Sequence, residues 1–278
     1  MNSVFFSPFE FQFMINAFVI ALIISIPTSF FSCYLVLKGW ALLGDAISHA
    51  VLPGIVLAHI FGFPLIIGAF CAGILCASAS EFLSQNSRVK EDTVMGIVFS
   101  GMFGLGIVLY LKTEPEIHLD HILFGNILGI SKLDILITGG IATFVTLILL
   151  LKRCDFLLHA FDPIQAKTSG MNTSVLNYGL LIMLSLTIVS TLSSVGIILS
   201  IGLLIAPGAI AFLITNQFKK MLVVAVILTL VFSFIGVYLS FFLDSAPAPT
   251  IILVLSLVFI VIFVSSQIKQ AGLSRNVK

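Results

Sequence analysis

Residues 221–243 read MLVVAVILTLVFSFIGVYLSFFL, and none of these side chains carries a charge. An α-helix that spans a bilayer needs roughly 20 consecutive, mainly apolar residues, and this run meets that length. The segment Ala246-Pro247-Ala248-Pro249 follows, and a second uncharged run then covers residues 249–266. Proline cannot continue a helix from the preceding turn, so the proline pair marks a break. The stretch therefore predicts two membrane-spanning helices joined by a tight turn.

The same pattern recurs in both directions along the chain and predicts an all-α, polytopic integral membrane protein with about eight to nine spans. We expect residues 1–278 to form a single transmembrane domain. Short breaks such as Phe61-Gly62-Phe63-Pro64 and Ser193-Ser194-Val195-Gly196 leave little backbone exposed to lipid. The expected spans, with boundaries uncertain by about 2–4 residues, are 13–36, 45–61, 64–80, 93–111, 133–151, 174–193, 195–215, 221–243 and 249–266.

Composition and missing motifs exclude several classes of function. The chain is 59% hydrophobic and only 9% charged, whereas globular proteins average about 25% charged residues. A net charge of +1 provides no basic surface for nucleic acid. The sequence contains no GxxxxGK[ST] loop for ATP and no HExxH, GxSxG or CxxC motif. We therefore expect a membrane protein that is not an enzyme.

The distribution of basic residues predicts the orientation in the membrane. Of the 13 lysines and arginines, only Lys112 and Lys132 fall in loops on one side of the predicted spans. Loops rich in lysine and arginine stay in the cytoplasm. The N-terminus is then outside and the C-terminus is cytoplasmic.

The second span opens with an unusual pair of ionisable residues, Asp45 and His49. Residues four apart share one face of a helix, and a carboxylate with an imidazole suits a first-row divalent metal. Ionisable residues inside a membrane are costly and are functional candidates by default. A structural Asp–His hydrogen bond that locks two spans is the alternative. Pro53-Gly54 follows one turn later and loosens the helix, as in the broken helices of transporters.

Three further groups of residues are candidates. His118 and His121 lie beside acidic residues in an external loop, where they meet a metal or a partner, or form a solvated acidic surface. Gly196, Pro207 and Gly208 lie in the expected span 195–215, which is rich in small residues like the span before it. This favours close helix packing or gating, with a kink at Pro207.

The inner loop over residues 152–172 contains Asp162, which we expect to cap a short helix with Pro163 at its first position. Two interpretations stay open for this loop, a docking surface for a cytoplasmic partner and a solvated connector.

The sequence resembles the permease subunits of metal-importing ABC transporters, the zinc/manganese/iron chelate uptake permeases. The most specific segment is KGWALLGDAISHAVLPG at residues 38–54. Its sequence resembles the manganese/iron branch of the family more than the zinc branch. Other similar segments are GIVFS at 96–100, HILFGNILG at 121–129, Asp162-Pro163 with Ala166 and Gly170, and Gly196-Ile197-Ile198-Leu199 leading to Leu204-Ile205-Ala206-Pro207-Gly208.

The resemblance implies an ABC importer permease fold in a bacterial cytoplasmic (inner) membrane and an assembly of several chains. A second permease chain, identical or paralogous, would complete the pathway. Each permease would bind a cytoplasmic ATP-binding subunit, and a solute-binding protein would deliver the metal from outside. Asp162, Pro163, Ala166 and Gly170 would form the coupling helix on the ATPase, while Asp45 and His49 would coordinate the passing ion. The resemblance implies no permanent cofactor, only the transported Mn²⁺ or Fe²⁺, or else Zn²⁺.

Two other functions compete with this one. A stand-alone proton-coupled secondary metal transporter would use Asp45 and His49 as a proton relay and need no ATPase. A structural membrane subunit would use the same pair only for packing.

Overall fold

The computed structural model describes residues 5–40, 42–113 and 127–275, and within these ranges every regular element is a helix. Nine of the described helices are long and apolar enough to cross a membrane, which confirms the predicted fold class. They are α2 (Gln12–Lys38), α3 (Leu43–Phe61), α4 (Leu65–Asn86), α5 (Glu91–Thr113), α7 (Lys132–Leu151), α10 (Thr173–Val195), α11 (Ile197–Ile214), α12 (Phe218–Phe242) and α13 (Pro247–Arg275).

Two of the predicted boundaries are wrong by more than four residues. The third span was expected to end at residue 80 and the ninth at residue 266, whereas α4 ends at Asn86 and α13 at Arg275. Backbone hydrogen bonding continues past the apolar run in α4, where polar side chains support the last turn. Gln85 Nε2 donates to Glu81 Oε1 over 2.6 Å, and Asn86 Nδ2 donates to the Phe82 carbonyl over 2.8 Å.

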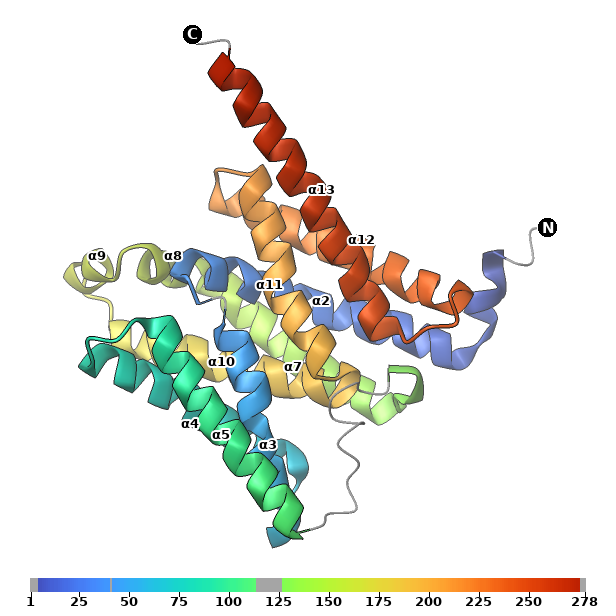
Figure 1. Ribbon diagram of the computed structural model, residues 1–278, viewed down its shortest axis with the longest axis horizontal. Coiled ribbons are helices and arrows are strands. Elements are labelled where there is room, and N and C mark those ends of the chain that lie inside the picture. The colour runs from blue at the N-terminus through green and yellow to red at the C-terminus, as the bar shows by residue number, and fades with distance from the viewer. Residues whose placement is uncertain (1–4, 41, 114–126, 276–278) are drawn as a thin grey trace.

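Four short elements complete the described fold: η1 (Ser7–Glu10), η2 (Ile127–Gly129), α8 (Arg153–Phe161) and α9 (Pro163–Thr168). Figure 1 shows α3, α4 and α5 grouped at one side of the bundle, α13 at the opposite side, and α2 between them. α2 contacts α7, α11 and α12, and its buried side chains, among them Phe31, Tyr34 and Leu35, form part of the largest core cluster. α8 and α9 lie together at one end of the bundle.

Glycines bring α3, α4 and α5 into close contact. A Cβ atom on Gly54 would collide with the Gly68 carbonyl, and a Cβ on Gly68 would collide with the Gly54 carbonyl. Gly106 of α5 leaves no more room, since its Cβ would lie 2.9 Å from the Pro53 ring. Small residues at such contacts let helices approach closely in a membrane. The Pro53-Gly54 pair thus lies where all three helices meet.

A single glycine separates α10 from α11. Gly196 has φ 86° and ψ 172°, a conformation that is essentially restricted to glycine. The expected break at Ser193-Ser194-Val195-Gly196 is therefore narrower than predicted, because α10 remains helical through Val195. One residue is enough to redirect the chain and start the next span.

Candidate functional site

α3 places Asp45 in its first turn and His49 one turn later. His49 Nε2 lies 3.3 Å from Asp45 Oδ1, and the two side chains are 26% and 33% exposed, respectively. The neighbouring residues Ala46, Ile47 and Ser48 are buried in the bundle. The α-helical repeat therefore turns both polar side chains to the one face of α3 that the rest of the chain leaves partly open.

Two phenylalanines of α5 hold the His49 ring. The ring centroid of His49 lies 5.9 Å from that of Phe99 and 5.2 Å from that of Phe103, the second in an edge-on arrangement. Nδ1 of His49 is buried and has no hydrogen-bond partner among the described residues. Packing on the aromatic rings, together with the Asp45 carboxylate beside Nε2, thus limits the orientation of the imidazole.

The pair combines an oxygen and a nitrogen donor, which suits manganese, ferrous iron or zinc. In the described part of the chain no group of three or more His, Cys, Asp or Glu side chains comes together as a metal site. A divalent ion bound here would thus keep most of its coordination positions for water or for ligands from another chain. Such weak, open coordination favours passage of the ion over permanent binding.

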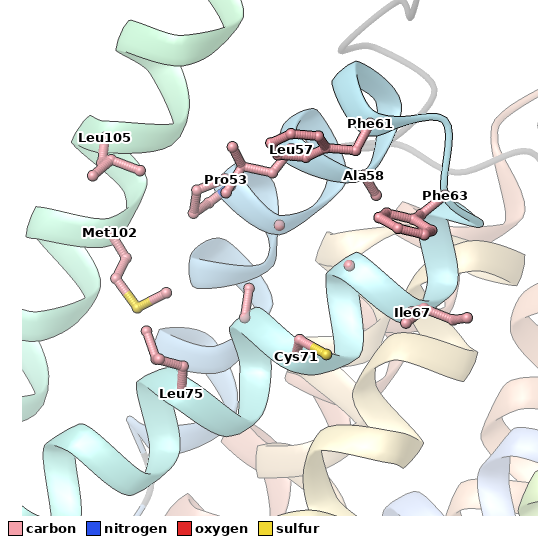
Figure 2. Close-up of a pocket in the computed structure, with 13 residues that line it drawn as sticks. Pro53, Leu57, Ala58, Phe61, Phe63, Ile67, Cys71, Leu75, Met102 and Leu105 are labelled. Atoms are coloured by element: carbon pink, nitrogen blue, oxygen red, sulfur yellow. The ribbon is translucent and has the colours of Figure 1, made fainter.

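A separate groove of about 560 Å³ lies further along α3 and is apolar. Figure 2 shows Pro53 and Leu57 of α3 facing Met102 and Leu105 of α5, with Cys71 of α4 beside them. The groove contains no carboxylate or imidazole, so it offers no hard ligand for a hydrated ion. The apolar groove and the Asp45–His49 pair thus lie at different levels along α3.

α11 is helical through Pro207, and a residue that sequence reasoning missed bonds to its backbone beside this proline. The expected kink stays a prediction. Ser32 Oγ of α2 accepts a hydrogen bond from the Gly208 amide over 2.7 Å and donates to the Ile205 carbonyl over 3.1 Å. A Cβ on Gly208 would collide with the Ser32 backbone. A side chain inserted beside a proline satisfies backbone groups that the helix itself cannot. No local sequence signal distinguishes Ser32 from the other serines of its span.

The predicted capping of the inner loop is confirmed. Asp162 Oδ1 accepts hydrogen bonds from the amides of Ile164 and Gln165 over 3.0 and 2.9 Å, and Pro163 is the first residue of α9. Ala166 is fully buried, whereas Gly170 follows α9 with φ 80°. Phe161 and Ile164 are 81% and 77% exposed, so α9 and its junction with α8 present apolar side chains at the end of the bundle.

The remaining candidates in the external loop, His118 and His121, lie outside the described residues. Their expected role stays a prediction from the sequence.

Comparison with known proteins is consistent across sequence and structure. The profile of the ABC 3 transport family matches residues 10–266. The chelated iron transport system membrane protein YfeD of Yersinia pestis is 52% identical over 262 residues, which cover 94% of this chain and 88% of YfeD. The manganese transport system membrane protein MntB of a Synechocystis strain is 41% identical over 259 residues, 93% of this chain and 85% of MntB. The solved structure of PsaBC from Streptococcus pneumoniae in complex with Fab superimposes with a TM-score of 0.84 at 34% identity, covering 95% of both chains.

Proposed function

Because this chain belongs to the ABC 3 transport family and is a multi-pass metal permease, we propose that it moves Mn²⁺ or Fe²⁺, or else Zn²⁺, inward through the membrane, driven by ATP hydrolysis on a partner chain. Relatives that are named as iron and manganese transport proteins support this choice of cargo. Alternating access would expose the site to one side at a time. The metal is cargo, and the mechanism needs no resident cofactor.

The Asp45–His49 pair carries this proposal. It is an oxygen and nitrogen donor set on a partly open face of a membrane-spanning helix, with a spacing of 3.3 Å between Oδ1 and Nε2. In a dimer with two-fold symmetry, the same pair from a second permease chain would face it and supply two carboxylates and two imidazoles. Separation of the two pairs on one side would then open the coordination shell and release the ion.

The ATP-binding subunit would act on the permease by contacting α8 and α9. Large apolar side chains exposed outside the spanning helices mark contact surfaces for partners, and Phe161 and Ile164 have this property. In this proposal they insert into a cytoplasmic ATP-binding subunit, while the Asp162 cap keeps the turn between α8 and α9 rigid. The N-terminus lies outside, where a solute-binding protein delivers the metal, and the C-terminus lies in the cytoplasm of a bacterial cell.

Uptake of radiolabelled manganese by cells that express the full assembly tests the proposal. Wild type, His49→Ala and an ATPase-dead partner are compared at matched membrane abundance, with iron and zinc as competitors. His59→Ala is the matched control, because His59 lies in the last turn of the same helix and is exposed. We expect the first two changes to reduce uptake to background and His59→Ala to preserve it.

Two outcomes contradict the proposal. Uptake that survives the dead ATPase favours the proton-coupled secondary transporter. Uptake that survives His49→Ala leaves this imidazole with a packing role only. The ranking of the competitors identifies the metal.

A further inference from the structure

A polar cluster joins three helices at the end of the bundle that carries α8 and α9. Lys38 is the last residue of α2, His159 lies in the last turn of α8, and Asn177 lies near the start of α10. Lys38 Nζ is 2.9 Å from Asn177 Oδ1 and 3.2 Å from His159 Nε2. His159 and Asn177 are almost fully buried, so these contacts are shielded from solvent. Three segments that are distant in sequence thus meet at one ammonium group.

Donor accounting assigns the proton positions in this cluster. A lysine ammonium has three donors and no acceptor, so it donates both to Asn177 Oδ1 and to His159 Nε2. With Lys38 as the donor, His159 Nε2 is unprotonated and the ring proton sits on Nδ1, which is buried without a hydrogen-bond partner among the described residues. The 3.2 Å approach of His159 Nε2 to Asn177 Oδ1 is then a contact between two acceptors of the same ammonium. A doubly protonated ring would face the ammonium with a second positive charge. The cluster therefore depends on a neutral His159.

The ammonium also contacts the only tryptophan. Lys38 Nζ lies 3.7 Å from the centroid of the Trp40 ring, a close cation–π contact. Trp40 is buried in the same core cluster as Met95 in the second turn of α5. Within the described residues Lys38 makes no ion pair, and neutral groups are its direct contacts, while the carboxylates of Glu81 and Glu91 act on its charge from a greater distance. An apolar side chain would be cheaper to bury at such a place, which points to a requirement for this geometry.

Contacts lead from this cluster in two directions. Toward the exposed loop, Tyr34 OH donates to the Arg153 carbonyl over 3.3 Å and its ring meets Phe156 edge-on, so α8 is attached to α2 along its length. Toward the candidate metal site, α5 continues from Met95, which shares the core cluster of Trp40, to Phe99 and Phe103, whose rings pack on His49. The two paths meet at Lys38 and Trp40.

We propose that Lys38 is a positioning residue that transmits the displacement of α8 and α9 to His49, through Trp40 and α5. The inference rests on the proposed function, because it assumes that α9 docks on an ATPase. A rigid, contiguous set of packed and hydrogen-bonded groups can carry such coupling between two sites. Without the ammonium, α8 moves independently of α5, and ATP is hydrolysed without rearranging the metal site.

The test uses the complete transporter, with ATPase and solute-binding protein, in proteoliposomes. ATP hydrolysis and ⁵⁴Mn²⁺ uptake are measured in the same vesicles for wild type, Lys38→Met and Lys38→Arg. Lys152→Met is the matched control, because Lys152 precedes α8 directly and its contact with Asp155 is on the surface. We expect Lys38→Met to keep hydrolysis within about twofold and to lower uptake at least about fivefold, the smallest usual effect of lost coupling between sites. Lys38→Arg, which keeps the charge and the donors, should restore part of the wild-type ratio of uptake to ATP hydrolysis.

A parallel loss of hydrolysis and uptake, or no loss of either, overturns the inference. If Lys38→Met does not assemble, His159→Ala decides instead, since it removes the acceptor on α8 and leaves α2 intact. It should produce the same uncoupling. Failure of both variants to assemble would make the cluster a folding element and overturn the inference as well. Absence of ATP-dependent uptake in wild-type vesicles would contradict the proposed function itself, which keeps the two failures distinct.

Discussion

The position of the His49 imidazole depends on its spacing from Asp45 and on its packing against α5. The spacing of four residues brings Nε2 to 3.3 Å from Oδ1, but the aromatic rings of α5 decide where the imidazole points. A hydrogen bond to a fixed backbone group would hold the ring more tightly. Aromatic packing leaves its edge available to an incoming ion, which suits a ligand that must bind and release within each transport cycle.

The pKa of His159 affects how the stability of the folded protein depends on pH. Burial lowers the pKa of the His159 imidazole, the Lys38 charge lowers it further, and the Asn177 contact and Glu81 act in the opposite direction. The unfolded chain therefore binds this proton more readily than the folded chain. The resulting penalty is absent well above the ordinary histidine pKa of about 6.5 and grows as the pH falls below it.

We accordingly expect the purified protein in detergent to melt at a lower temperature at pH 5.5 than at pH 7.5. His159→Gln keeps an oxygen acceptor for Lys38 and does not titrate, so its melting temperature should fall less over the same interval. Thermal unfolding at the two pH values measures both differences. If the melting temperature fell equally for wild type and His159→Gln between pH 7.5 and pH 5.5, the assigned neutral state of His159 would be contradicted.

At the scale of elements, the contact of α3 with α4 depends on the absence of side chains at Gly54 and Gly68. The two glycines approach each other so closely that a Cβ on either would collide with the backbone of the other. The Asp45–His49 pair lies on the same helix as Gly54, so a change in this contact tilts the site as well. The packing of α3 on α4 and the position of the Asp45–His49 pair therefore depend on each other.

Gly68→Val tests this contact away from the candidate site. Overpacking of a close contact costs about 1–3 kcal/mol, so the variant should unfold at a lower temperature or denaturant concentration than wild type. Gly101→Ala is the matched control, because no atom lies within 4 Å of a Cβ at this glycine of α5. A stability of Gly68→Val equal to that of the control would show that α3 and α4 separate freely.

At the scale of the whole molecule, apolar surface is distributed in two ways. Most exposed hydrophobic side chains belong to spanning helices, where lipid would cover them, whereas Phe161 and Ile164 lie on short helices at the end of the bundle. The lipid accounts for the first group but not for the second. A partner that covers α9 explains the second group.

We expect Phe161→Ser with Ile164→Ser to reduce recovery of the ATP-binding subunit with the permease at least about tenfold, the equivalent of about 1.4 kcal/mol of binding. Co-purification from membranes measures this loss. Cys154→Ser is the control, because Cys154 is exposed on the first turn of α8. Undiminished recovery with the double variant would place the docking surface elsewhere.

The nine predicted spans are helices in the structure, because a bilayer requires long apolar segments whose backbone groups are hydrogen-bonded internally. Such segments can be recognised from local sequence alone. The Asp162 cap is equally local, since the donors lie two and three residues away. The ends of α4 and α13 were misjudged because hydropathy measures burial in lipid, whereas a helix continues as long as its backbone bonds do.

The amino-acid sequence by itself determined the membrane class, the spans, the Asp45–His49 spacing and the capped loop, since each depends on residues within a few turns. Only the tertiary structure decided that Phe99 and Phe103 pack on His49, that Ser32 bonds to the backbone of α11 beside Pro207, and that Lys38 meets His159 and Asn177. These contacts join residues from separate helices, and close packing selects them by the shape of both surfaces. Such complementarity is a property of the assembled bundle, and no single segment contains it.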